Sequence, residues 1–219
     1  VFLDKYGVLA EVTATARTSV ERYTFPGGEG HILLNLGEGL TNESGAMVRR
    51  VSATEIEGTK LLGTFCYNAQ KVFPVYFVLR VSKTPSASGY WKKQRAMTGV
   101  EAEWTPDNGR DKLYMEYGRE LSGDDVGYWF SFDGLAAGEQ VEVRMGISYV
   151  STENARKNLD AEQAADATFD AIREQARKGW NEALGRIRVE GGTEEQQRVF
   201  YTALYHALLH PNLVSDVNG

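Results

Sequence analysis

The sequence is poor in cysteine and has no long apolar run. Its 219 residues include one cysteine, Cys66, so an intrachain disulfide framework is excluded. Cys66 lies in a strand-like run, and we interpret it as a buried, inert thiol. No apolar stretch approaches the ~20 residues that a membrane-spanning helix needs, and no signal-peptide pattern is present. We therefore predict no membrane span.

The chain also lacks an excess of positive charge. It carries 24 Lys and Arg against 30 Asp and Glu, which gives a net charge of -6. An acidic chain gains no electrostatic attraction to a phosphate backbone or an anionic membrane. Nucleic acid is therefore a poor candidate partner. The remaining composition, 42% hydrophobic and 25% charged, is ordinary for a globular protein.

Motifs that would reveal a reaction are missing as well. There is no phosphate-binding glycine loop, no Gly-x-Ser-x-Gly elbow and no Cys/His nucleophile pair. His206 and His210 have a spacing that can hold zinc, but Ala207 stands where a zinc protease has its glutamate. Because no third ligand lies nearby, we predict no metal site here. The favoured interpretation of His206 is a hydrogen-bonded core or interface histidine, with a sugar-facing role as the alternative.

Residues 1–150 have the pattern of many short β-strands. The strand-like runs cover residues 11–15, 31–36, 46–57, 72–81, 100–104, 112–117, 128–132 and 141–145. Glycine-rich turns separate them, and residues 106–109 have the composition of a hairpin turn. Pro74 cannot donate to a ladder, so we expect it at a strand start, an edge or a bulge. This spacing predicts an antiparallel sandwich or barrel.

The pattern changes to helical at Ser151, which has the features of a helix start. A second helix is predicted from about Asp166 to Leu184, with apolar residues recurring at helical spacing. Residues 186–190 resemble a short return strand. Residues 193–196 form a capping box, which predicts a third helix ending before Pro211.

Aromatic and acidic residues offer weak candidates for a sugar site. Trp104, Trp129 and Trp180 fit core positions, whereas Tyr90 and Trp91 are equally compatible with the core and with an exposed platform for a sugar ring. The carboxylates Glu101 and Glu103 alternate with apolar residues, which favours the polar face of a strand over a catalytic pair. We assign no catalytic residue.

Several segments resemble the glycoside hydrolase family 92 α-mannosidases. They are Glu11–Arg17, Arg22–Pro26, Ile32–Leu34, Val75–Val78 and Gly146–Leu159. The most specific are Trp180–Ile187, Phe200–His206, His210–Asn212 and Ser215–Gly219. Together they extend over essentially the whole chain.

The resemblance implies a mainly β fold with C-terminal helices: an antiparallel β-supersandwich, a helical linker and the first helix of an (α/α)6 barrel. It implies an N-terminally truncated sandwich at 1–150, a linker with a return strand at 151–190 and the start of the catalytic domain at 191–219. It also implies a fragment of a calcium-dependent, inverting exo-α-mannosidase that acts on mannose-containing glycans.

The family's acid, base and calcium ligands lie downstream, so no position here matches them. The resemblance makes the missing barrel the natural partner of residues 193–210, and without it we expect a contact with a crystal neighbour or a second copy there. The substrate-facing candidates are Tyr90, Trp91, His206, His210 and Asn212. The expected location is the periplasm, the cell surface or the extracellular space. The alternative function is a free-standing carbohydrate-binding or adhesion module.

Overall fold

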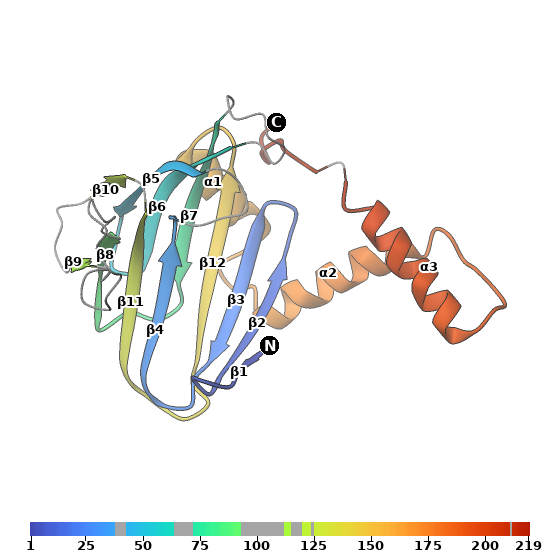
Figure 1. Cartoon of the computed structure of the whole chain (residues 1–219), viewed down its shortest axis with the longest axis horizontal. Helices are drawn as coiled ribbons and strands as arrows, with labels where there is room; N and C mark the ends of the chain where they lie inside the picture. Colours follow the sequence, from blue (N-terminus) through green and yellow to red (C-terminus); the bar gives the residue numbers. More distant parts are fainter. Residues whose placement is uncertain (38–42, 64–71, 93–111, 115–119, 124, 211) are drawn as a thin grey trace, which may run out of the picture.

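The computed structural model shows a β-sandwich followed by three helices (Figure 1). It describes residues 1–37, 43–63, 72–92, 112–114, 120–123, 125–210 and 212–219. The strands are β1 (Phe2–Leu3), β2 (Val8–Ala14), β3 (Thr18–Thr24), β4 (Gly28–Asn35), β5 (Glu43–Arg50), β6 (Glu55–Leu62), β7 (Phe73–Val81), β8 (Ala87–Lys92), β9 (Lys112–Tyr114), β10 (Glu120–Gly123), β11 (Val126–Leu135) and β12 (Gln140–Ser148). The helices are α1 (Thr152–Glu162), α2 (Phe169–Leu184) and α3 (Glu194–Ala207).

Two antiparallel sheets of unequal width form the sandwich. The larger has the order β1-β2-β3-β12-β7-β6-β5-β10, and the smaller has the order β4-β11-β8-β9. Every described strand pair is antiparallel. The two sheets do not close on each other within the described residues, which selects the sandwich over the barrel and confirms the predicted fold class.

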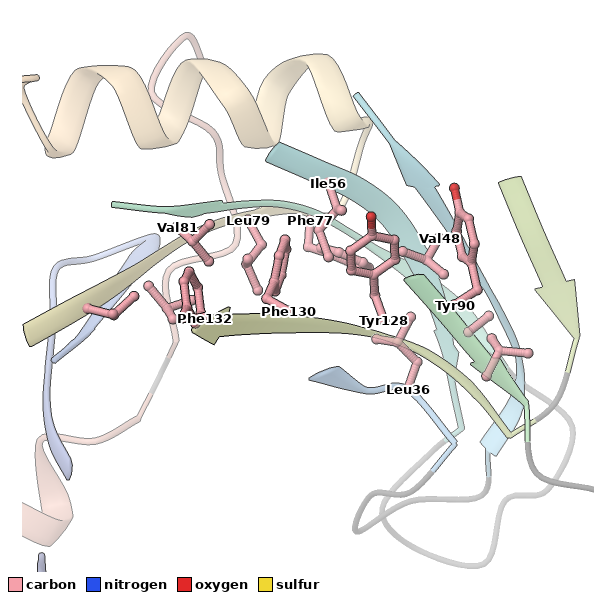
Figure 2. Close-up of a cluster of buried hydrophobic side chains, with 14 of the residues drawn as sticks. Leu36, Val48, Ile56, Phe77, Leu79, Val81, Tyr90, Tyr128, Phe130 and Phe132 are labelled. Atoms are coloured by element: carbon pink, nitrogen blue, oxygen red, sulfur yellow. The ribbon is translucent and has the colours of Figure 1, made fainter. Parts of the chain in front are cut away.

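The core lies between the two sheets and is built on alternation along β11. Tyr128, Phe130 and Phe132 point from β11 toward the larger sheet and are almost fully buried (Figure 2). Phe77, Leu79 and Val81 of β7 meet them from the opposite side. Burial of side chains of this size stabilises the fold by roughly 1.5–3 kcal/mol each.

The outer face of the larger sheet is covered by α1. Val78 points away from the sandwich core and packs against Ala155 and Leu159 of α1. The helix comes so close to β12 that a Cβ at Gly146 would lie 2.4 Å from the carbonyl oxygen of Ala155. The central strands are therefore buried on both faces, which explains why residues 72–79 carry no charged side chain and do not alternate.

Charged groups complete the contact between α1 and the sheet. Arg156 of α1 donates to Glu55 at 2.6 Å and to Glu57 at 2.7 Å, and Arg49 also bonds Glu57. Glu57 is 4% exposed. Burial alone would raise the pKa of this carboxyl, but the hydrogen bonds from Arg156 and Arg49 outweigh burial and hold it below its ordinary value of 4.5.

The predicted strand runs match most of the described strands, but no run was predicted for β3, β8 or β10, and two predicted runs were wrong. Pro74 is the second residue of β7, as expected for a strand start. Residues 46–57, predicted as one run, contain the turn between β5 and β6, where Val51 and Ser52 donate to the carbonyl of Glu55. Residues 186–190 form no strand. The hydroxyl of Tyr201 on α3 instead bonds backbone groups of Ile187 and Val189.

Both sheets end in edge strands in the part of the chain that is described. Beside β4 lies a groove of about 450 Å³, lined by residues that include Tyr6, Tyr23 and Phe25. Residues of β1, β2 and β3 from the larger sheet and of β4 from the smaller sheet contribute to its lining. N-terminal truncation of the sandwich stays a prediction.

Some predictions fall on residues outside the described ranges. These are the buried thiol of Cys66, the core position of Trp104, the strand face with Glu101 and Glu103, the turn at 106–109 and the stop at Pro211.

Replacing Phe130 by alanine should lower the free energy of unfolding by about 3–5 kcal/mol, because it removes a ring from the centre of the core. Phe73→Ala is the matched control, since Phe73 is 41% exposed and should cost much less. Urea denaturation of both variants measures the difference, and equal losses would contradict this account of the core.

The lowered pKa of Glu57 predicts acid sensitivity at the α1 contact. A carboxyl with a folded pKa below its unfolded value adds stability above about pH 4.5, and this stability is lost as the pH falls through the folded pKa. The free energy of unfolding of Glu57→Gln should therefore depend less on pH than that of the unmodified chain between about pH 5 and pH 3. Urea titrations at several pH values test this, and parallel pH curves would count against it.

Candidate functional site

Helices α2 and α3 carry a surface with exposed apolar side chains. We call these two helices the helical arm. The base of the arm is fixed to the sandwich, because Phe169 and Ile172 pack on Val20 of β3. Arg22 lies over the Phe169 ring at 4.2 Å and donates to Asp170 at 3.0 Å. Beyond this base the arm projects away from the two sheets (Figure 1).

Helix α3 exposes apolar side chains instead of burying them. Its start is well formed, since Thr193 and Gln196 make the predicted capping box. None of its residues is buried, and Val199 is 65% exposed. Its contact with α2 includes the rings of Trp180 and Tyr205, whose centroids are 4.6 Å apart. An amphipathic helix with an uncovered apolar face indicates a docking surface.

The candidates at the end of the arm are exposed. His206, His210 and Asn212 are all open to solvent in this chain. His206 is therefore not a core histidine within this chain, and the predicted interface position stays a prediction. Its ring lies beside that of Tyr205, with the centroids 5.7 Å apart. It is exposed because none of the residues of α3 is buried in this chain. Their exposure is compatible with a sugar-facing role, which stays a prediction for these three residues.

Of the two positions left open for Tyr90 and Trp91, the structure shows the core and excludes the exposed platform. The two residues are 2% and 4% exposed, because the polar segment that precedes them continues into β8. Tyr90 enters the core against Tyr128, and its hydroxyl accepts from the backbone N–H of Arg50 at 3.0 Å. Trp91 lies over Gly127, where a Cβ would be 2.3 Å from the indole nitrogen.

Two tryptophans predicted in the core are only half-buried. Trp129 points to the opposite side of β11 from Tyr128, as strand alternation requires. Trp180 lines a groove of about 480 Å³ between the arm and the turn that joins β2 to β3. The small residues Ala176, Gly179 and Ala183 of α2 line the same groove at helical spacing.

The buried carboxylates of the described residues are poor general acids. A general acid in glycoside hydrolysis needs a raised pKa. Glu57 is held by two arginines, and Asp216 accepts hydrogen bonds from Ser148, Asn154 and Asn158. Burial raises the pKa of Asp216, but those three bonds together with Arg17 bring it below its ordinary value. Both groups are therefore stabilised as anions.

The Asp216 cluster was missed by sequence reasoning. Asn154 and Asn158 stand four residues apart and so share one face of α1, which was the only available signal. Across the described ranges, no group of three or more His, Cys, Asp or Glu side chains gathers in a way that could hold a metal ion. No helix in those ranges is long and apolar enough to span a membrane.

Solved structures of similar fold are glycoside hydrolases. The family GH92 α-mannosidase BT3965 from Bacteroides thetaiotaomicron is 26% identical with a TM-score of 0.80, and the match covers 100% of this chain and 27% of that one. The GH92 glycosyl hydrolase ccman5 is 28% identical with a TM-score of 0.79, over 97% of this chain and 26% of that one. The inverting mannosidase BT2199 from Bacteroides thetaiotaomicron VPI-5482 is 25% identical with a TM-score of 0.72, over 94% and 25%. The chain thus spans about a quarter of each.

Family models divide the chain where the sandwich gives way to helices. The glycosyl hydrolase family 92 N-terminal domain matches residues 1–148, and the glycosyl hydrolase family 92 catalytic domain matches residues 154–219. No curated protein sequence matches the chain. Because the first match alone extends over more than half of the residues and agrees with the fold, the chain belongs to glycosyl hydrolase family 92.

Proposed function

We propose that this chain is part of a calcium-dependent, inverting exo-α-mannosidase that acts on mannose-containing glycans. In this proposal the sandwich helps to shape the sugar cleft, and an (α/α)6 barrel carries out catalysis. The observation that carries the proposal is the likeness to α-mannosidases over 100% of the chain, with matches to both family domains in order.

The substrate class rests on the relatives. BT3965 is an α-mannosidase and was also solved in complex with mannoimidazole. Inversion at the sugar carbon rests on BT2199, which is described as an inverting mannosidase. An inverting glycosidase uses two carboxyl groups about 6.5–9.5 Å apart, one as the acid and one as the base that activates water. Since the pKa values of the buried carboxyls Glu57 and Asp216 are lowered and not raised, we place the general acid outside the described residues.

Calcium is part of the proposal, although its ligands are not assigned to this chain. The described side chains form no group of acidic or histidine residues that fits a cation. When bound, calcium would supply positive charge to sugar hydroxyls. We also propose that the protein works in the periplasm, at the cell surface or outside the cell.

The apolar face of α3 supports a barrel as the partner of the helical arm. A 14-residue helix is only marginally stable without packing, yet α3 buries none of its side chains in this chain. A complete capping box closes the first turn of α3, and this favours a stable helix. In this proposal further helices of the catalytic domain cover that face. A second copy or a crystal neighbour on residues 193–210 is the alternative occupant.

Val199→Asp tests the role of the α3 face. In the 219-residue chain the substitution should change the free energy of unfolding by less than about 0.5 kcal/mol, because Val199 is 65% exposed. In the full-length gene product it should lower the thermal midpoint by several degrees, because it would bury a charge among apolar side chains. Val51→Asp, in the turn between β5 and β6, is the control. It should change stability equally in the 219-residue chain and in the full-length gene product. Equal effects of Val199→Asp in both would contradict the barrel contact.

The activity assay tests the proposed function itself. The 219-residue chain should release no mannose from mannobiosides with calcium present. The full-length gene product should release mannose with inversion, and a chelator should abolish the release. Turnover by the short chain that is lost on replacing one of its own carboxylates would refute the assignment of catalysis to the barrel.

A further inference from the structure

Beyond the helical arm, the chain returns to the sandwich at a buried carboxylate, that of Asp216. Residues 208–210 and 212–215 are exposed, whereas Asp216 is 6% exposed. The segment that follows α3 therefore has a fixed point on the sandwich after a stretch with little packing. Figure 1 shows this segment running from α3 back toward α1.

Both oxygens of the Asp216 carboxylate accept hydrogen bonds from side chains. Its Oδ2 accepts from the Ser148 hydroxyl at 3.0 Å and from the Asn154 amide at 2.7 Å. Its Oδ1 accepts from the Asn158 amide at 2.7 Å. The Asn158 oxygen in turn accepts from the backbone N–H of Val217 at 2.9 Å, which continues the contact along the chain.

Arg17 binds the backbone of the same segment. Its Nε donates to the carbonyl of Ser215 at 2.6 Å, and its Nη2 reaches the carbonyl of Asp216 at 3.5 Å. Glu162, at the end of α1, orients Arg17 through a bond of 2.6 Å from Nη1. The segment 215–217 is thus bonded to the β2–β3 turn, the end of β12 and α1.

These bonds cross the boundary between the two family domains. Arg17 and Ser148 lie in the region that matches the N-terminal domain. Asn154, Asn158 and Asp216 lie in the region that matches the catalytic domain. Hydrogen bonds to charged groups are among the stronger ones, and a buried carboxylate without its donors is costly. The Asp216 carboxylate, together with Arg17, therefore ties the catalytic-domain segment after α3 to the sandwich.

We propose that Asp216 is a positioning residue, a latch that fixes the catalytic-domain chain after α3 against the N-terminal domain. The proposal rests on the proposed glycosidase function for its effect on turnover, but the latch itself is a property of this chain. Because a misplacement of about 1 Å at reacting groups can cost about 100-fold in rate, loosening the joint between two domains that shape one cleft should slow turnover.

Asp216→Asn tests the latch with little change in volume. One carboxylate oxygen becomes an NH2 group, which then faces either the Asn158 amide or the donors Ser148 and Asn154. Hydrogen exchange on the 219-residue chain should show the Val217 amide exchanging at least about tenfold faster, which is the effect of losing ~1.4 kcal/mol of protection. The amides of β7 should keep their exchange rates.

Asp170→Asn is the matched control. Asp170 also joins the helices to the sandwich, through Arg22, but it lies at the base of the arm and is exposed. Asp170→Asn should leave the exchange rate of the Val217 amide unchanged. Asn154→Ala removes one of the three donors and should give a smaller increase at Val217, which keeps the test valid if Asp216→Asn does not fold. Unchanged exchange at Val217 in both latch variants would overturn the proposal.

In the full-length gene product, Asp216→Asn should lower kcat on an aryl α-mannoside by about tenfold or more per folded molecule. The folded fraction is measured by near-ultraviolet circular dichroism. A fall in activity that only follows the loss of folded protein would overturn the positioning role. If the unmodified full-length protein releases no mannose, the proposed function fails, while the exchange result still decides whether the latch exists.

Discussion

The side chains that β11 sends between the sheets determine the geometry of the whole sandwich. Tyr128, Phe130 and Phe132 fill the gap along the length of the strand, and β7 supplies the opposing row (Figure 2). Sheets packed face to face need about 10 Å between them, and large aromatic rings span that distance. In the smaller sheet, β11 supplies most of the large buried side chains, and Tyr90 of β8 adds to them.

A second layer follows from the same strands. With β7 and β12 committed to the core on one face, their other face needs its own cover, and α1 provides it. Gly146 permits this close approach on β12, and Ser148 at the end of the same strand donates to Asp216. Strand β12 therefore contributes to the sandwich core, to the contact with α1 and to the latch on the catalytic-domain segment.

The sequence was sufficient for the elements whose signals are local. Capping residues, helical spacing and glycine-rich turns predicted the three helices and most strands, because these depend on neighbours along the chain. Tyr90 and Trp91 could not be placed in this way. Trp91 lies against Gly127, which is distant in sequence and leaves room for the indole, and Tyr90 packs on Tyr128. The same holds for Asp216, whose three donors come from β12 and α1.

The central claim is that the sandwich is held by its own core, whereas the helical arm is completed by a catalytic domain. Hydrogen exchange of the α3 amides, compared between a monomeric 219-residue chain and the full-length gene product, tests it most directly. The account predicts fast exchange of the amides at 199–207 in the short chain and strong protection in the full-length protein, with β7 protected in both. Protection of α3 equal to that of β7 in the monomeric short chain would show that the helix is held within this chain, and would contradict the account.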